Sequence, residues 1–207
     1  MSVPFYQLML VTHRQACALD DYLRFVETCA RAGVTSVQLR EKKASAAFLF
    51  RFAVKLKALL SPLHIPLIIN DHIDLALAVN ADGVHLGADD GCPGKARKQL
   101  GHHRIIGLSL ESMGDLVKAN QVDADYVAAS AVFPTNNKTN VRRHWGIEGL
   151  HRLAKQSRHP LIGIGGIDAG NLKAVMAAGA RGVAVIGAIH DAPDPVLAIQ
   201  TLRALQR

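Results

Sequence analysis

Residues 81–84 are "ADGV", and the same kind of joint returns as "ADYV" at 124–127 and "ARGV" at 180–183. At each joint a stretch with helical periodicity ends and a short run rich in Val, Ile or Leu begins. We interpret the joint as part of a repeated supersecondary unit. The repetition predicts alternating strands and helices around a parallel sheet.

The same alternation extends outward from these joints along the whole chain. Strand-like runs lie near 6–11, 34–39, 66–70, 83–86, 104–108, 124–128, 161–164 and 182–186. Helix-like stretches follow them at about 19–32, 44–60, 72–79, 94–100, 112–121, 146–157, 169–178 and 194–206. Eight such units in 207 residues predict an α/β protein, a (β/α)8 TIM barrel forming a single domain over 1–207.

A doubly wound sheet that binds a dinucleotide is the main alternative fold. Such a sheet has fewer strands and a glycine-rich first turn, whereas the first turn here, "THRQAC" at 12–17, has no glycine. The stretch "GIGGID" at 163–168 has Asp168 where the last glycine of the dinucleotide motif belongs. We therefore expect no nucleotide cofactor.

Composition limits the surroundings and partners of the chain. No long apolar run and no signal-peptide start are present, so we expect a cytoplasmic protein that does not contact a membrane. The three cysteines are scattered, which argues against a disulfide framework or a structural zinc site. The net charge of +7 is dispersed, and this favours small anionic ligands over nucleic acid. The sequence leaves the oligomeric state open, a homo-oligomer included.

The stretch "VQLREK" at 37–42 keeps the alternation of a strand while becoming polar. In a barrel, Val37 and Leu39 would face the helices, and Gln38, Arg40 and Lys42 would point into the mouth at the carboxyl ends of the strands. Side chains two residues apart on a strand are about 6–7 Å apart, which suits the several oxygens of a diphosphate. A solvated rim of ion pairs is the alternative.

Acidic side chains follow the next two strands. Asn70 and Asp71 end one run, and Asp89 and Asp90 come just beyond the other. Neighbouring carboxylates are costly unless a cation lies between them, and Mg²⁺ prefers such oxygen ligands. The alternatives are a helix N-cap for Asp71 and a turn acid for Asp89.

The later strand ends also carry groups suited to anions. Ser109 could donate to a phosphate or cap the next helix. The connection at 130–146 is long and polar and includes Lys138, which suggests a loop that closes over substrate, although a solvated loop is the alternative. Gly165, Gly166 and Gly187 would expose backbone N–H groups to an anion or serve only as tight turns.

These motifs, taken in order, resemble those of the thiamine phosphate synthase family. The matching stretches are "VQLREK", "LIINDHIDLALAVNADGVHLGADD" (67–90), "GLSLES" (107–112), "ADYVAASAVFPTNNK" (124–138) and "PLIGIGGIDAGNLKAVMAAGARGVAVIGAI" (160–189). The resemblance implies a barrel transferase that joins hydroxymethylpyrimidine diphosphate to hydroxyethylthiazole phosphate with Mg²⁺, releasing pyrophosphate. It covers most of the chain.

The resemblance also implies roles for individual residues. The pyrimidine diphosphate would be bound by Gln38, Leu39, Arg40, Glu41, Lys42, Asn70, Ser109 and Lys138, of which Arg40, Lys42, Ser109 and Lys138 would be catalytic. The thiazole phosphate would contact Thr135, Asn136, Asn137, Gly166, Ile186 and Gly187, and Asp71 and Asp90 would bind the metal. His85 is expected to be a hydrogen-bonded barrel histidine, and Trp145 to pack the base of the loop.

Several positions differ from the family pattern. Asn137 replaces a common threonine, Gly187 replaces a serine, and Ser130-Ala131 stands where Gly-Pro is frequent. We expect altered affinity at the thiazole end, since asparagine and the backbone N–H of glycine can still donate hydrogen bonds. The alternatives are a thiazole tautomerase, whose expected histidine is Glu111 here, and a non-catalytic barrel that binds thiamine precursors.

Overall fold

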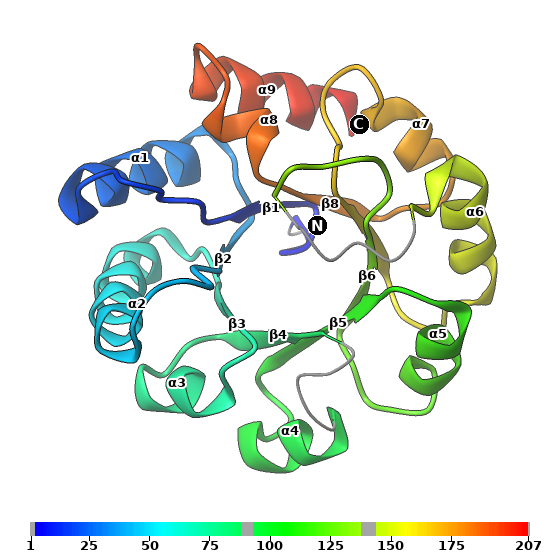
Figure 1. Ribbon diagram of the computed structural model, residues 1–207, viewed down its shortest axis with the longest axis horizontal. Coiled ribbons are helices and arrows are strands. Elements are labelled where there is room, and N and C mark those ends of the chain that lie inside the picture. The colour runs from blue at the N-terminus through cyan, green and yellow to red at the C-terminus, as the bar shows by residue number, and fades with distance from the viewer. Residues whose placement is uncertain (1–2, 88–92, 138–143, 207) are drawn as a thin grey trace.

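A computed structural model describes residues 3–87, 93–137 and 144–206, and its centre is a closed barrel of parallel strands in sequence order (Figure 1). The strands are β1 (Leu8–Val11), β2 (Ser36–Leu39), β3 (Leu67–Asn70), β4 (Gly83–Leu86), β5 (Ile105–Leu110), β6 (Tyr126–Ser130), β7 (Leu161–Ile164) and β8 (Gly182–Val185). β8 pairs with β1 and closes the ring. The predicted (β/α)8 barrel and its eight strands are confirmed.

Helices surround the barrel (Figure 1). They are α1 (Leu19–Ala32), α2 (Ala46–Leu60), α3 (Ile73–Ala78), α4 (Pro93–Leu100), α5 (Met113–Ala119), α6 (Gly146–Gln156), α7 (Leu172–Ala177) and α9 (Pro195–Leu205). All eight correspond to predicted helices. Two short elements were not predicted, the 3-10 turn η1 (Ser61–Leu63) and the helix α8 (Gly187–His190), because elements this short show no hydrophobic period.

Strand alternation sorts side chains between the barrel interior and the layer under the helices. Val37 and Leu39 belong to the large apolar cluster between strands and helices, as predicted. Met9 and Tyr126 belong to the smaller cluster inside the barrel. Gln38 is also buried there, and its Nε2 donates to Met9 Sδ over 3.4 Å. Gln38 is therefore on the inward face of β2, the face that continues toward the mouth of the barrel.

The joint that recurs at 81–84, 124–127 and 180–183 forms hydrogen bonds between the amino ends of neighbouring strands. The backbone N–H of Asp82 donates to Leu67 O (3.0 Å), and its carboxylate accepts the N–H of Leu67 (2.8 Å). Asp125 makes the same pair of bonds with Ile106, both 2.8 Å long. The third joint keeps the backbone bond through Arg181 without a carboxylate. The repeat is structural and lies at the opposite end of the barrel from the strand ends that bear the predicted site.

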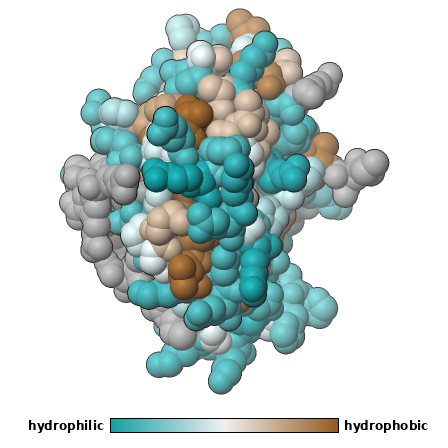
Figure 2. All heavy atoms as spheres, turned by 90° about the vertical axis from the view of Figure 1, so that its right-hand side faces the viewer, coloured by the Kyte–Doolittle hydropathy of each residue, from teal (hydrophilic) through white to brown (hydrophobic). Residues whose placement is uncertain are grey.

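The outer surface is mostly hydrophilic on the side that carries α6, with scattered apolar side chains (Figure 2). Within the described ranges, no helix is both long and apolar enough to span a bilayer.

Candidate active site

A cavity of about 610 Å³ lies at the carboxyl ends of the strands. Most of the predicted site residues line it. They are Gln38, Arg40, Lys42, Asn70, Asp71, Ser109, Thr135, Asn137, Gly166, Ile186 and Gly187. The barrel therefore brings together side chains from β2 to β5 and backbone turns from β6 to β8, although they are far apart in the sequence.

A few predicted residues lie elsewhere. Leu39 and Glu41 line a smaller adjoining pocket of about 220 Å³. Leu39 is buried under the helices, and the Glu41 carboxylate accepts the backbone N–H of Arg14 over 3.0 Å. Asn136 is not among the residues that line the main cavity. The predictions for Asp89, Asp90 and Lys138 fall outside the described residues.

Arg40 reaches across the cavity from the end of β2. Its Nη1 donates to Asn137 O over 3.4 Å, and its backbone N–H donates to Thr12 Oγ1 over 2.9 Å. Burial lowers the pKa of the guanidinium, while the carboxylates of Asp71 and Glu41 raise it. An arginine pKa starts so high that the group keeps its charge at neutral pH. Arg40 is thus a partly buried, permanent cation.

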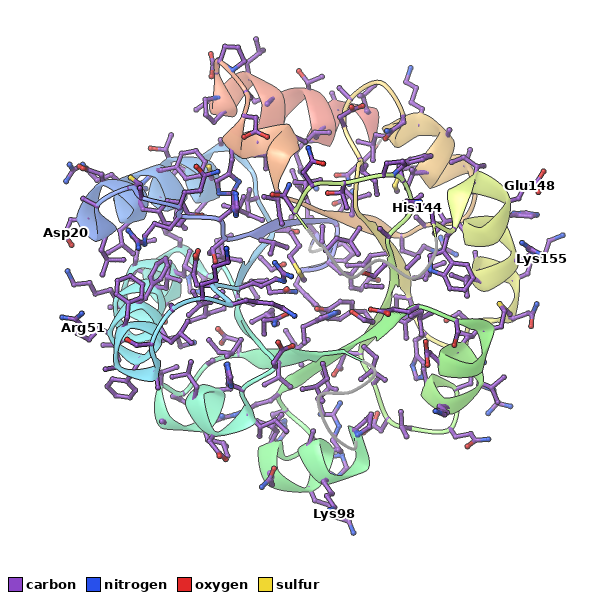
Figure 3. All side chains as sticks on the ribbon, viewed as in Figure 1. Asp20, Arg51, Lys98, His144, Glu148 and Lys155 are labelled. Atoms are coloured by element: carbon purple, nitrogen blue, oxygen red, sulfur yellow. The ribbon has the colours of Figure 1, made fainter. Side chains whose placement is uncertain are left out.

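Lys42 and Asp71 face each other at the rim, with 3.9 Å between Nζ and Oδ2. The lysine side chain is 57% exposed, so water screens this pair and its stabilising effect is small. By contrast, the exposed cations Arg51, Lys98 and Lys155 extend outward from the helices (Figure 3). The position of Lys42 at the cavity, rather than its ion pair, distinguishes it from these surface cations.

Asp71 has a left-handed backbone, with φ +66°, and its N–H donates to His85 O over 2.9 Å. The N-cap of α3 is His72, so the alternative that Asp71 caps this helix is wrong. The carboxylate is instead part of the cavity wall beside Asn70. A residue at positive φ is uncommon outside glycine, and asparagine and aspartate accept it best.

Ser109 is held by a buried histidine. His85 Nε2 lies 2.9 Å from Ser109 Oγ, and His85 Nδ1 lies 2.8 Å from the hydroxyl of Tyr126. Burial raises the pKa of Tyr126, which stays neutral. Ser112, not Ser109, caps α5 through a capping box with Asp115. His85 is thus a hydrogen-bonded barrel histidine as predicted, and the capping alternative for Ser109 is wrong.

Glycines form the opposite wall after β7. Gly165 and Gly166 have φ of +97° and +63°. A Cβ on Gly166 would lie 2.5 Å from Pro134 O, and one on Gly165 would lie 2.5 Å from the Cβ of Ala131. Both positions exclude a side chain, so the backbone comes close to the 130–137 segment and to the cavity.

The turn after β8 has a different neighbour. A Cβ on Gly187 would lie 2.7 Å from Asp191 Oδ2 and 3.8 Å from Asn137 Nδ2. Asn137 and Gly187, two of the positions that differ from the family pattern, are therefore neighbours in the structure. Ile186 is the N-cap residue of α8, so the unpredicted helix begins at the predicted thiazole end.

The structure adds cavity residues that the sequence analysis did not assign. Ser130, Ile164, Asp168 and Glu111 line the cavity as well. Ser130 continues the inward alternation that begins at Tyr126, and that alternation could have identified it. Trp145 is 6% exposed and its Nε1 donates to Leu110 O over 2.9 Å, which agrees with the prediction that it packs at the base of the loop.

The residues 8–189 match the model of a family described as thiamine monophosphate synthase. The chain belongs to this family. It is 43% identical to the thiamine-phosphate synthase of Chlamydia caviae over 205 residues, covering 99% of this chain and 97% of that protein. It is 41% identical to the thiamine-phosphate synthase of Vibrio campbellii over 202 residues, covering 98% of each.

A solved structure of the thiamine phosphate pyrophosphorylase from Pyrococcus furiosus is also similar. It matches with a TM-score of 0.87 and 31% identity, covering 98% of this chain and 96% of that one. The family and the enzyme class that the sequence predicts, a thiamine phosphate synthase and hence a transferase, are therefore confirmed.

Proposed function

We propose that this enzyme joins hydroxymethylpyrimidine diphosphate to hydroxyethylthiazole phosphate, giving thiamine phosphate and pyrophosphate, with Mg²⁺ as the metal. The observation that carries the proposal is a single cavity with charged side chains on the β2–β5 side and closely packed glycine turns on the β6–β8 side. The two sides suit two different anionic substrates. The similarity to thiamine-phosphate synthases over nearly the whole chain supports the pairing.

The diphosphate would bind on the charged side. Arg40 and Lys42 supply cationic donors there, and Ser109 supplies a hydroxyl that His85 orients. Asn70 and Gln38 line the deeper wall and would contact the pyrimidine diphosphate as neutral donors. Lys138, from the 130–146 connection, would add a third cation when substrate is bound.

Asp71 and Asp90 would bind Mg²⁺ next to the diphosphate. The Asp71 carboxylate fits this role, because it is a hard oxygen donor in the cavity wall. Among the described residues no group of three or more His, Cys, Asp or Glu could hold a metal. Mg²⁺ commonly takes only one or two protein carboxylates and completes its shell with water and phosphate oxygens. When bound, the ion would neutralise negative charge on the departing pyrophosphate.

The reaction then needs one bond broken and one formed. The bond between the pyrimidine methylene carbon and the diphosphate oxygen breaks, and its electron pair leaves with pyrophosphate. The aminopyrimidine ring delocalises the resulting cation. Arg40, Lys42 and Lys138 stabilise the oxygen where negative charge grows. The lone pair of the thiazole nitrogen forms the new bond to the methylene carbon, so the protein need not supply a nucleophile.

The thiazole phosphate would bind across the cavity. Its phosphate would accept hydrogen bonds from the backbone at Gly166 and Gly187, as phosphates commonly do after strands seven and eight of such barrels. Thr135, Asn136, Asn137 and Ile186 would complete this end. The 130–146 connection, closing over both substrates, would keep water from the cation, since water would convert it to an alcohol.

A pyrophosphate-release assay tests the proposal. Purified protein with both substrates and Mg²⁺ should release pyrophosphate together with thiamine phosphate, and omission of the thiazole phosphate or of Mg²⁺ should abolish the product. Isomerisation of the thiazole without pyrophosphate release would indicate a tautomerase instead. Binding of both compounds without turnover would indicate a non-catalytic barrel, and either result would reject the synthase.

A further inference from the structure

A tyrosine and a histidine meet just beyond the thiazole end of the cavity. Tyr22 lies on α1 and is 4% exposed, and its hydroxyl is 2.7 Å from Nε2 of His190, the last residue of α8. Their rings stack, with centroids 5.8 Å apart and planes 16° from parallel. A mostly buried polar contact therefore joins the first helix of the barrel to the short helix that follows β8.

The neighbouring bonds fix the direction of this contact. The backbone N–H of His13 donates to the Tyr22 hydroxyl over 2.8 Å, so this oxygen already accepts one hydrogen bond. His190 Nδ1 lies 2.9 Å from Ile186 O, and a carbonyl can only accept, so Nδ1 carries the hydrogen. In the neutral ring Nε2 is then bare and accepts the single hydrogen of Tyr22. The neutral form satisfies every polar atom of this pair.

The Tyr22–His190 pair connects the two sides of the cavity, the β2–β5 side and the β6–β8 side. Ile186 O accepts both the ring Nδ1–H and the backbone N–H of His190 (3.0 Å), and Ile186 and Gly187 line the cavity. On the β2–β5 side, Arg14 follows His13 in the chain, and its backbone N–H donates to the carboxylate of Glu41, two residues after the end of β2. A series of hydrogen bonds therefore links the chain after β2, which carries the cations of the cavity, to the turn that begins α8.

We propose that Tyr22 and neutral His190 are positioning residues that hold the Ile186–Gly187 turn in place for the thiazole phosphate, and that protonation of His190 loosens this turn. The inference rests on the proposed placement of the thiazole phosphate. Neither residue belongs to the cavity wall, so both act through the backbone of the turn.

The surroundings of His190 favour its neutral form. Burial lowers its pKa, and the nearby ring of His13, 6.1 Å away, acts in the same direction. The backbone carbonyl that it binds and the carboxylates of Asp191 and Glu41 raise the pKa, and α1 faces it with the uncharged Tyr22 hydroxyl. Because the pKa lies below its ordinary value, the turn stays positioned at neutral pH. This positioning of the turn is lost as the pH falls through the lowered pKa of His190 and the ring becomes protonated.

Tyr22→Phe tests the contact, because it removes the hydroxyl and keeps the ring. We expect the KM for thiazole phosphate to rise by about tenfold at pH 7.5, since two partly buried partners of the hydroxyl, the His13 N–H and His190 Nε2, lose their bond. The KM for pyrimidine diphosphate and kcat should stay within about twofold. Tyr6→Phe, in the turn before β1, is the matched control and should change neither KM.

His190→Gln tests the role of protonation. Its side-chain oxygen can accept the Tyr22 hydrogen, and the residue cannot become a cation in the acidic range. We expect a KM for thiazole phosphate close to that of the wild type at pH 7.5 and a smaller rise between pH 7 and pH 5. The second ionisation of the substrate phosphate, near pH 6, contributes equally to both proteins, so the difference between them isolates His190.

Three outcomes would overturn the inference: an unchanged KM for thiazole phosphate in Tyr22→Phe, an equal rise in both KM values, or a His190→Gln profile identical to wild type. Gly187→Ala distinguishes the positioning role of Tyr22 and His190 from the proposed placement of the thiazole phosphate, because the new Cβ enters the turn directly. If Gly187→Ala alone raises the KM for thiazole phosphate, the placement stands and the positioning pair fails. If neither Gly187→Ala nor Tyr22→Phe raises it, the placement fails together with the inference.

Discussion

The two sides of the cavity are suited to bind anions by different means. On the β2–β5 side, Arg40, Lys42 and Asp71 present charged side chains at the ends of the strands. On the β6–β8 side, Gly165 and Gly166 bring the backbone itself to the cavity, at φ values that favour glycine. A side-chain site can lose one group and keep its framework, whereas a backbone site cannot accept a side chain without moving. The two sides should therefore respond differently to substitution.

The largest effect is expected on the backbone side, from Gly166→Ala. The new Cβ would lie 2.5 Å from Pro134 O and 2.8 Å from the Cβ of Phe133. Left-handed strain of about 1 kcal/mol and overpacking of about 2 kcal/mol should together lower the free energy of unfolding by about 3 kcal/mol. The KM for thiazole phosphate should rise as well. Chemical denaturation and steady-state kinetics measure the two effects.

Gly101→Ala is the matched control for this substitution. Gly101 shares the left-handed backbone, with φ +74°, but apart from its chain neighbours no atom of the described residues lies within 4 Å of its Cβ position. Gly101→Ala should lower the free energy of unfolding by about 1 kcal/mol, because it adds only the left-handed strain, and it should leave both KM values unchanged. Equal losses of stability in the two variants would mean that crowding does not fix the Gly166 turn.

The next largest effect is expected on the charged side, from Arg40→Met. Methionine keeps much of the side-chain length and removes the cation, so kcat/KM for pyrimidine diphosphate should fall by about 100-fold. The KM for thiazole phosphate should change much less. Arg51→Met, on the outward face of α2 (Figure 3), removes the same charge far from the cavity and should leave kinetics unchanged. A larger effect on thiazole phosphate would reverse the assignment of the two sides.

The charged side could be predicted from the sequence because its information is local. The alternation in "VQLREK" alone sends Gln38 and Arg40 inward, and the end of the next strand places Asn70 beside them. The backbone side depends on distant neighbours. Whether Gly166 is only a tight turn depends on Pro134, which no local pattern brings near it.

The contact between Tyr22 and His190 is the extreme case of such dependence. The two residues are 168 positions apart and meet only because β8 closes on β1. α8, which carries His190, is also too short to show a hydrophobic period in the sequence. Barrel closure is predictable from the number of units, but the pairs of side chains that it brings together are not.

A smaller effect is expected from Asp71→Asn, which asks whether a metal contributes to the charged side. Asparagine tolerates the left-handed backbone at this position, so the fold should be kept. Loss of the carboxylate charge should raise the Mg²⁺ concentration for half-maximal activity by about tenfold. Asp74→Asn, in the first turn of α3, changes a nearby carboxylate outside the cavity wall as a control. Identical Mg²⁺ titrations of Asp71→Asn and wild type would remove Asp71 from the metal site.

The smallest effect is expected where the two sides are joined, at Trp145. Its ring Nε1–H donates to Leu110 O at the end of β5, and its backbone N–H donates to Ala131 O after β6, both over 2.9 Å. Trp145→Phe keeps most of the packing and loses the ring hydrogen bond, which should lower the free energy of unfolding by about 1 kcal/mol.

Because Trp145 is the only tryptophan, circular dichroism rather than intrinsic fluorescence should follow the unfolding of this variant. Both KM values should stay within about twofold of wild type, since the backbone bond to Ala131 remains. If the ring bond instead kept the two sides in register, both KM values would rise together while stability changed little. The two sides would then depend on each other, and the separate effects expected for Gly166→Ala and Arg40→Met would have to be measured again in the Trp145→Phe background.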